Sequence, residues 1–451
     1  MIKGQWDSDY FWHLTTGELI VRSGEIPRLD PYSFTWGGEW TTHEWLSEVA
    51  IFALVSTLGV PVTLGIFGLL PPLALGLLAV TMLRQGVATR AVVVATLLAG
   101  LVLIPYVAIR PQVISWTMVA ALLALLIAVR PATSRLLGLL PLLFVLWANL
   151  HGLYVIGLGI VGLYCLFTLI GATPMAPARL SVLAAAVASF AASALTPAGI
   201  AGLWYPLRYL DGQDWGLAHI PEWQSPNFHD AVQLPLLGLI VALALTVERV
   251  PQRWIQVLAL GALVGALFAN RNIPVLAVAS MPALAIGMQN SGGWLTRRGD
   301  GDDPRRRLVE VAAAAAVAAG AIAAIPASAG ARGLVLDAYP VLGVRTLIEH
   351  RPDARVVAEY GWGGYVISQL FDRGGRVFVD GRNDMYPEQI LRDYSALREG
   401  DPGWEEIVSR HRVEAMLFPP EAPIVTGIAQ LAGWCEAQRD ATQVLLLREC
   451  G

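Results

Sequence analysis

A series of apolar segments fills most of the chain between residues 60 and 326. Because about 20 apolar residues cross the hydrocarbon core of a bilayer, this pattern predicts a polytopic α-helical membrane protein. Only 15% of the residues are charged, against roughly 25% in soluble domains. We place about ten spans, at residues 60–83, 91–108, 112–129, 136–150, 152–170, 180–196, 232–248, 254–269, 273–288 and 308–326.

The breaks between these spans alternate in character, which predicts the side of the membrane on which each lies. One set contains most of the arginines, and the positive-inside rule assigns it to the cytoplasm. The other set contains polar motifs, and it is assigned to the exoplasmic side together with the start and the end of the chain. The arginine-rich set comprises Arg84, Arg90, Arg130, Arg135, Arg179, Arg249, Arg253 and the arginines between 297 and 307.

Two carboxylates one residue apart, Asp7 and Asp9, lie near the start of the chain, and His13 follows them. A carboxylate at a membrane surface can act as the general base on an acceptor hydroxyl. It can also bind a divalent cation, Mg or Mn, that bridges a phosphate leaving group. The simpler interpretation is that both acids only solvate a loop. We predict that at least one of them is essential and that His13 helps to bind the substrate.

His43 and Glu44 open a predicted amphipathic helix at residues 43–58. Such a helix lies at the bilayer interface more readily than it crosses the bilayer. Thr42 would cap this helix, and acids near its first turn would favour the helix dipole. Participation of His43 and Glu44 in catalysis is the second interpretation, and the two roles are compatible.

Further polar residues lie at the exoplasmic ends of the spans. The guanidinium group pairs well with phosphate oxygens, so a clamp on a phosphate or diphosphate is one interpretation. Anionic lipid headgroups would also explain the arginines. The loop at 199–231 is either an interfacial belt or a mobile segment that covers the substrate. The candidate binding residues of these regions are Arg110, Asn149, His151, Glu222, Arg271 and Asn272.

After residue 326 the composition changes to that of a soluble α/β domain. Its glycines and aromatic residues would let a sugar or a peptide approach the backbone and stack, or they only form turns between strands and helices. The binding candidates are Tyr360, Trp362, Asp380, Arg382 and Asp384. We predict strands at 355–359, 376–380, 414–418 and 443–447, and helices at 364–371, 387–398 and 404–411.

The chain is therefore predicted to have three parts: an exoplasmic first loop with its amphipathic helix (1–58), a transmembrane domain (59–326) and an exoplasmic α/β domain (327–451). An exoplasmic residue 1 leaves the first loop without a helix to bring it across. We therefore expect that a transmembrane helix preceding the first loop is missing from this chain. Cys435 and Cys450 are candidates for a disulfide in an oxidising compartment.

A set of short motifs extends over nearly the whole chain. They are Asp7-x-Asp9, Trp12-His13-Leu14, Asp30-Pro31-Tyr32-Ser33-Phe34-Thr35, His43-Glu44-Trp45-Leu46, Arg110-Pro111-Gln112, Trp147-Ala148-Asn149-Leu150-His151-Gly152, Glu222-Trp223, Arg271-Asn272 and Tyr360-Gly361-Trp362-Gly363-Gly364-Tyr365. With these motifs the chain resembles a group of bacterial polytopic proteins of the GT-C glycosyltransferase type. The resemblance implies a helical membrane domain and an exoplasmic active site.

More remotely, the layout is similar to oligosaccharyltransferase catalytic subunits and protein O-mannosyltransferases. This likeness implies a polyprenyl-phosphate-linked sugar donor and gives Asp7 or Asp9 the role of the acidic motif in the first exoplasmic loop. It also implies that residues 360–365, followed by Val379-Asp380, correspond to the acceptor-binding W-W-D-Y-G segment of oligosaccharyltransferases. The double Trp of that segment and its Asp are absent from this chain.

Two functions from different classes follow. The first is an inverting glycosyltransferase of the bacterial plasma membrane, in which Asp9, or failing that Asp7, is the base, and Arg110 and Arg271 stabilise the departing lipid phosphate. Its partners are membrane lipids, the lipid-linked donor and a glycan, lipid or protein acceptor, with no nucleic acid. The second is a lipid-linked-saccharide transporter or a membrane assembly scaffold. A transporter would place ionisable residues at mid-span, where the sequence has almost none.

Overall fold

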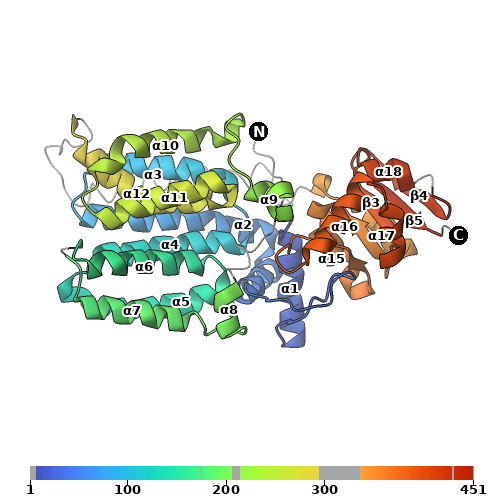
Figure 1. Cartoon of the computed structure of the whole chain (residues 1–451), viewed down its shortest axis with the longest axis horizontal. Helices are drawn as coiled ribbons and strands as arrows, with labels where there is room; N and C mark the ends of the chain where they lie inside the picture. The colour runs from blue at the N-terminus through green and yellow to red at the C-terminus, as the bar shows by residue number, and fades with distance from the viewer. Residues whose placement is uncertain (1–6, 174, 206–213, 294–335, 429–430, 450–451) are drawn as a thin grey trace.

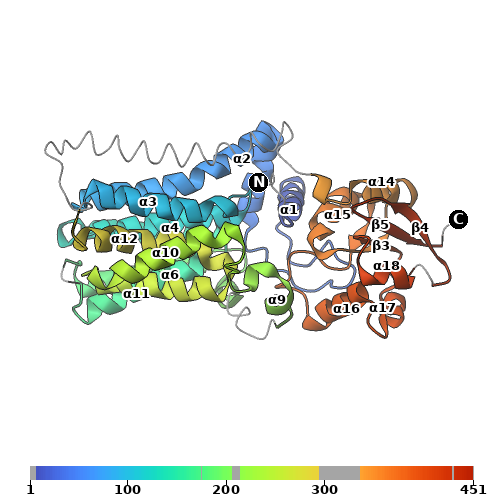
Figure 2. The same cartoon turned by 90° about the horizontal axis from the view of Figure 1, so that it is seen from above.

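The computed structural model of the chain describes residues 7–173, 175–205, 214–293, 336–428 and 431–449. A bundle of apolar helices and a smaller α/β domain lie end to end, and the first polar segment lies between them (Figure 1). The perpendicular view shows the same arrangement, with helix α1 (Tyr10–Ser23) at the junction (Figure 2). The predicted fold class, a polytopic helical membrane protein with a C-terminal α/β domain, is confirmed.

The bundle supplies the membrane-spanning part of the protein. Among the described residues, six helical stretches are long and apolar enough to cross a membrane, namely Trp45–Arg84, Thr89–Tyr106, Pro111–Ala128, Pro131–Leu150, Ala231–Arg249 and Asn270–Asn290. Three shorter apolar helices accompany them: α6 (Tyr154–Leu169), α7 (Arg179–Ala192) and α11 (Arg253–Phe268). Nine of the ten predicted spans therefore coincide with described helices, and the tenth, at 308–326, lies outside the described residues.

Helix α12 (Ile273–Asn290) forms the centre of the bundle and is buried along nearly its whole length. It packs against α3 (Thr89–Leu103), α11 and α10 (Leu234–Thr246). The outer helices instead leave large apolar side chains exposed, such as Leu180 on α7 and Leu245 on α10. A helix that is apolar on its outer face suits a lipid surrounding. The remaining long helices are α2 (Trp45–Arg84), α4 (Pro111–Ala128) and α5 (Leu139–Leu150).

Helix α2 joins the predicted amphipathic helix to the first predicted span. The two meet at a break at Gly59, whose backbone angles (φ 80°, ψ 164°) are not helical. From the sequence alone, the pair Pro71-Pro72 predicts a kink within this span, but α2 continues through both prolines with no non-helical angle at either. Glycine adopts the positive φ of such a break at little cost, and Pro61 two residues later suits the start of a new helical turn.

The polar first segment also contains a helix that the sequence pattern did not reveal. Helix α1 has mixed polar and apolar residues, and it ends at Gly24, which is left-handed (φ 71°). With 14 residues it is too short to span a bilayer, as expected for this segment. It packs against α2 on one side and against α15 (Gly363–Leu370) of the C-terminal domain on the other.

The C-terminal domain has a five-stranded sheet in the order β2-β1-β3-β5-β4. Strands β2 (Arg376–Val377), β1 (Arg355–Ala358) and β3 (Ala415–Phe418) are parallel, whereas β5 (Val444–Arg448) and β4 (Trp434–Arg439) are antiparallel to their neighbours. Strand β2 is shorter than predicted, and β4 was missed. The helices are α14 (Val341–His350), α15, α16 (Glu388–Glu399), α17 (Trp404–His411) and α18 (Pro423–Ile428), of which α14 and α18 were missed.

The first polar segment extends this sheet. Ser33 forms a parallel bridge with Val377 of β2. The amide of Val377 donates to the carbonyl of Tyr32 (3.0 Å), and the amide of Phe34 donates to the carbonyl of Val377 (3.0 Å). Residues from the beginning of the chain therefore cover the β2 edge of a sheet formed near its end.

The two predicted classes of loop lie at opposite ends of the bundle. At one end, Arg130 bonds Gln85, and Arg249 bonds Ser291. At the other end, the polar motifs contact one another and the C-terminal domain, as described below. The side of the membrane on which each end lies stays a prediction. Cys435 is disulfide-bonded, as predicted. Its predicted partner, Cys450, lies outside the described residues.

Candidate active site

The predicted catalytic residues lie where the bundle meets the C-terminal domain. Asp7 and Asp9 immediately precede α1, and Arg110 is the residue before α4. Glu222 comes from the short helix η4 (Pro221–Trp223) in the loop between α9 (Asp214–His219) and α10. These side chains come from three separate parts of the sequence, and the fold brings them together.

Arg110 binds three carboxylates. Its Nε lies 3.3 Å from Asp7, its Nη1 lies 2.5 Å from Glu222, and its Nη2 forms a close ion pair with Asp9. Three carboxylates around one guanidinium leave a net negative charge. This cluster of four side chains therefore attracts cations or a further hydrogen-bond donor. The exposed fractions of the side chains are 6% for Asp7, 15% for Asp9 and 42% for Glu222, so Asp7 is the innermost acid.

The C-terminal domain presses its backbone against Asp9. A Cβ atom added to Gly381 would overlap the Asp9 carboxylate, and one added to Gly364 would overlap the carbonyl of Ser8. Trp12 Nε1 and Ser8 Oγ each donate to Asp9 Oδ1 at 3.2 Å. Gly364 and Gly381 therefore permit a close approach, as predicted. The group that approaches them is the acidic loop of the same chain, residues 7–9.

Asp7 is held by its surroundings and is hard to ionise. Its Oδ1 accepts from the amide of Asp9 (2.9 Å), and its carbonyl accepts from the Tyr339 hydroxyl (2.7 Å). Burial raises the pKa of Asp7 to about 6, although the charge of Arg110 opposes that shift. Arg110 lowers the pKa of Glu222, so Glu222 is ionised when Asp7 begins to titrate.

The raised pKa of Asp7 predicts a pH dependence of stability. The folded protein binds the Asp7 proton more tightly than the unfolded chain, whose ordinary value is 3.8. Ionisation therefore destabilises the fold as the pH rises from about 4 to about 6, by about 2–3 kcal/mol at the upper end. We expect the stability of wild type relative to Asp7→Asn to fall across this window and to be level above it. Thermal unfolding of both proteins between pH 4 and 7.5 measures this; a constant difference would contradict it.

A second group of side chains surrounds Glu44. Its Oε1 lies 3.1 Å from His151 Nε2 and 3.5 Å from His43 Nε2, and its Oε2 lies 3.7 Å from His13 Nδ1. Burial opposes ionisation, yet the positive charge of His43 lowers the pKa of Glu44 below its ordinary value. In return, and against burial, Glu44 raises the pKa of His43 to about 9. Glu44 and His43 are therefore a partly buried ion pair.

His151 is the neutral member of this group. Its Nδ1 accepts from the amide of Leu153 (3.1 Å) and lies 3.0 Å from the Ser115 hydroxyl, which itself accepts from Trp147 Nε1 (2.8 Å). These donors assign the ring proton to Nε2, which points at Glu44. Burial lowers the pKa of His151 to about 3, in agreement with that assignment.

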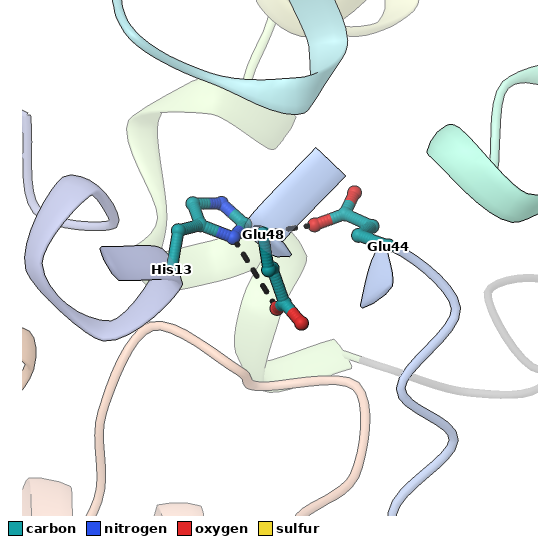
Figure 3. A group of neighbouring side chains, drawn as sticks. All are labelled: His13, Glu44 and Glu48. Atoms are coloured by element: carbon teal, nitrogen blue, oxygen red, sulfur yellow. Dashed lines mark ion pairs between the residues drawn. The ribbon is translucent and has the colours of Figure 1, made fainter. Parts of the chain in front are cut away.

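Glu48 lies one turn after Glu44 and was not predicted as a site residue. Its side chain is 1% exposed, and its Oε1 lies 3.5 Å from His13 Nδ1 (Figure 3). Burial raises the pKa of Glu48. Acids four residues apart share one face of a helix, so the spacing was a usable signal. The sequence pattern of residues 43–58 instead predicts that Glu48 lies on the polar face of the amphipathic helix.

A divalent cation needs a group of side-chain donor atoms that lie close together. Asp7 and Asp9 already face Arg110, which supplies positive charge there. Among the residues that the structure describes, one group of potential ligands has donor atoms within 4.8 Å of one another: His13, Glu44 and Glu48. The predicted cation between Asp7 and Asp9 therefore finds better ligands in this neighbouring group.

Asp384 and Arg271 lie close to both groups. Burial raises the pKa of Asp384 to about 6, and the charge of His43 opposes this shift. The guanidinium of Arg271 lies 4.2 Å from the ring centroid of Trp223, next to Glu222 in sequence. After Arg110, Arg271 also lowers the pKa of Glu222. Arg110 and Arg271 thus contact neighbouring residues of the same short helix η4.

Other predicted binding residues have bonds that serve the fold. Asn149 Oδ1 accepts from Trp45 Nε1 (2.8 Å), and its amide donates to the carbonyls of Val145 and Leu195. The Asn272 amide donates to the carbonyl of Gly265 (3.0 Å). Both residues therefore connect helix ends around the site.

The aromatic residues of the C-terminal motif lie behind the acidic loop. Trp362 is buried, and its Nε1 donates to the carbonyl of Ala338 (2.9 Å). Tyr360 packs against Trp215 and Tyr394, with ring centroids 5.5 and 6.1 Å away. The negative charge of Asp9 acts on Tyr360, which places that phenol near the acidic loop. Burial is the main reason that the pKa of Tyr360 is raised, and the charge of Asp9 adds to that shift.

Asp380 and Arg382 form a buried brace with Asp30. Arg382 Nη2 lies 2.6 Å from Asp380 and 2.9 Å from Asp30, and the three side chains are at most 1% exposed. The guanidinium also lies over the rings of Tyr32 (4.7 Å) and Trp40 (4.5 Å). This brace joins the first segment to the C-terminal domain, beneath the residues that could touch a substrate. Asp30 was not predicted, although its motif was recognised.

No protein-family model matches the chain, and no curated protein matches it in sequence. Solved structures match it in fold. The archaeal oligosaccharyltransferase AglB from Archaeoglobus fulgidus, in complex with an inhibitory peptide and a dolichol-phosphate, gives a TM-score of 0.59 at 13% identity, covering 92% of this chain and 66% of AglB. The oligosaccharyltransferase of that organism in complex with Zn and sulfate gives 0.57 at 15% identity, covering 92% and 64%.

ArnT from Cupriavidus metallidurans bound to undecaprenyl phosphate gives a TM-score of 0.54 at 13% identity, covering 98% of this chain and 94% of ArnT. The chain thus spans just under two thirds of the oligosaccharyltransferase and nearly all of ArnT. It has the GT-C fold, as its motifs predicted.

Proposed function

We propose that the chain is an inverting glycosyltransferase that moves a sugar from a polyprenyl-phosphate-linked donor to an acceptor. The main support is the pair Asp7 and Asp9, held against Arg110 at the junction of a GT-C bundle and a C-terminal domain. A lipid phosphate at the membrane surface would arrive at this junction. Two proteins of similar fold, AglB and ArnT, have dolichol-phosphate and undecaprenyl phosphate in their structures.

In the proposed reaction, the Asp9 carboxylate accepts the proton of the acceptor hydroxyl. The acceptor oxygen bonds to the anomeric carbon while the bond from that carbon to the phosphate oxygen breaks, so the configuration inverts. The lipid phosphate leaves with the bonding electrons, and Arg110 and Arg271 stabilise its charge. Asp9 is preferred over Asp7 because its carboxylate is more exposed.

Glu222 is proposed to hold Arg110 until the donor binds. It is the most exposed of the three acids on Arg110 and belongs to the loop before α10. A donor phosphate offers the same kind of oxygen atoms to the guanidinium, so it can replace Glu222 there. The loop is then free to close over the sugar. This role matches the interpretation of the loop at 199–231 as a segment that covers the substrate.

The reaction is placed on the exoplasmic side of the plasma membrane. The site lies at the end of the bundle away from Arg130 and Arg249, which the positive-inside rule assigns to the cytoplasm. The disulfide of Cys435 supports the same side, because disulfides persist in oxidising compartments. The donor sugar and the acceptor are left open, with glycan, lipid and protein acceptors all in the test.

The clamp predicts a specific kinetic effect of Arg271. Removing one charge-assisted contact to phosphate costs about 1.5–3 kcal/mol, so Arg271→Gln should raise the KM for the donor about 10- to 100-fold. The turnover number should change less, because Arg110 still faces the leaving group. Arg253→Gln, at the other end of the bundle, is the matched control. An unchanged KM in Arg271→Gln would remove this residue from the clamp.

The function itself is tested with the full chain in lipid nanodiscs and a panel of polyprenyl-phosphate sugars. Release of polyprenyl phosphate in the presence of glycan, lipid or peptide acceptors supports a transferase. Donor binding, measured by a shift in thermal unfolding, without any release would instead favour the transporter or scaffold.

A further inference from the structure

Three buried ligand-type side chains point toward one another beside the proposed catalytic loop. His13 comes from α1, and Glu44 and Glu48 come from the start of α2 (Figure 3). The exposed fractions are 3% for His13 and 1% for Glu48. Within the described part of the chain, both carboxylate oxygens of Glu48 and the Nδ1 atom of His13 lack a hydrogen-bond partner. Buried polar atoms without partners are costly, so this arrangement calls for a missing ligand.

The two distances from His13 to the carboxylates suit ligands around one small ion, and all three donor atoms lie within 4.8 Å of one another. His13 Nδ1 lies 3.7 Å from Glu44 Oε2 and 3.5 Å from Glu48 Oε1. Both distances exceed the usual range of a hydrogen bond, about 2.7–3.2 Å. Two ligands about 2.1 Å from a tetrahedral ion are about 3.4 Å apart. The pairs are therefore too far apart to bond directly and close enough to share a metal.

The surroundings hold Glu44 in a ligand orientation. Its Oε1 lies 3.1 Å from His151 Nε2, and His151 is held in turn by Ser115 and Leu153. The other oxygen, Oε2, faces His13. An outer shell that orients a ligating carboxylate in this way is a general property of protein metal sites.

We propose that His13, Glu44 and Glu48 bind a divalent transition-metal ion of the zinc class. Imidazole nitrogen and carboxylate oxygen are both zinc ligands, and three protein ligands leave a fourth position for water. Imidazole favours zinc over magnesium, whose preferred ligands are oxygens. The ion also compensates the charge of two buried carboxylates.

The ion would hold α1 against α2. His13 follows Asp9 by one helical turn, and its amide donates to the Asp9 carbonyl (3.1 Å). A metal on His13 therefore positions the helix that begins at the proposed base, without touching Asp9 itself. This site is separate from the acids that bind Arg110, and its existence does not depend on the proposed reaction.

The test measures metal directly. The full chain is purified through a tag that binds no metal, and its zinc content is determined by inductively coupled plasma mass spectrometry. We expect about one zinc per chain. Chelation should lower the temperature of unfolding, and Zn²⁺ should restore it where an equal concentration of Mg²⁺ does not. A folded wild-type protein that binds no zinc after such a titration overturns the proposal.

Variants locate the ion. Glu48→Gln and His13→Gln should each weaken zinc binding more than tenfold, and Glu48→His, which supplies another ligand, should retain it. Glu18→Gln is the matched control, because Glu18 is an exposed acid on the same helix α1. Zinc bound equally well by Glu48→Gln and His13→Gln would place it elsewhere and overturn the proposal. If either variant fails to fold, chelation of the wild type still decides whether zinc binds.

Discussion

Replacing Asp9 with Asn should reduce sugar transfer by about 10²- to 10⁴-fold. The amide has the shape of the carboxylate and keeps an oxygen for Trp12 and Ser8, but it cannot take the proton of the acceptor hydroxyl. The turnover number should fall, and the KM for the donor should change little, because Arg110 and Arg271 still bind the phosphate. The measurement is the initial rate of polyprenyl phosphate release at saturating donor.

Ser8→Ala is the matched control for this change. It removes a hydrogen bond to Asp9 from the same loop and leaves the charge in place. We expect it to be nearly as active as wild type and to unfold at nearly the same temperature. Full activity of a correctly folded Asp9→Asn protein would exclude Asp9 as the base and would turn attention to Asp7.

Replacing Arg382 with Met should destabilise the protein by about 3–5 kcal/mol. Arg382 is buried with Asp30 and Asp380, and its loss leaves two carboxylates without a counter-ion in the interior. The effect should appear as a lower temperature of unfolding in detergent. Since the brace joins the first segment to the C-terminal domain, faster proteolysis near residue 30 should accompany it.

A second arginine across the same interface provides the control. Arg22 lies 2.9 Å from Asp372, but both side chains are mostly exposed. Exposed ion pairs contribute little, so Arg22→Met should leave the unfolding temperature unchanged within error. Adding Asp30→Asn and Asp380→Asn to Arg382→Met should recover much of the loss, because no buried charge is then left unpaired. Equal effects of Arg22→Met and Arg382→Met would contradict the importance of burial.

Much of the fold was predictable because hydropathy is a local property. Spans such as 112–129 and 232–248 agree with α4 and α10 within a few residues. The break in α2 was predicted at the wrong place, because Pro71-Pro72 is the more obvious helix-breaking signal. The correct signal was Gly59 followed by Pro61. Helix α1 was missed because its apolar residues serve two partners, α2 and α15, and so do not form one stripe.

The sequence predicted which residues form the candidate site better than it predicted which of them contact one another. Motif spacing and topology indicated that Asp9, Arg110 and Glu222 share one face of the membrane, and the structure brings them into contact. The partnership of Asp30 with Arg382 could not be predicted, because it joins residues far apart in sequence and nothing local distinguishes this pair. Glu48 was recognisable from its spacing to Glu44, but the interfacial helix was expected to face water on that side.

The bridge between Ser33 and Val377 bears on how the protein is made. The first segment, which contains Ser33, is synthesised early, whereas its partner strand β2 is completed more than 300 residues later. The first segment therefore stays unpaired while the membrane helices insert, and contacts so distant in sequence form slowly. Until then, the edge of β2 is an open template for wrong partners. The pairing of the first segment with β2 can therefore form only after the C-terminal domain has been synthesised.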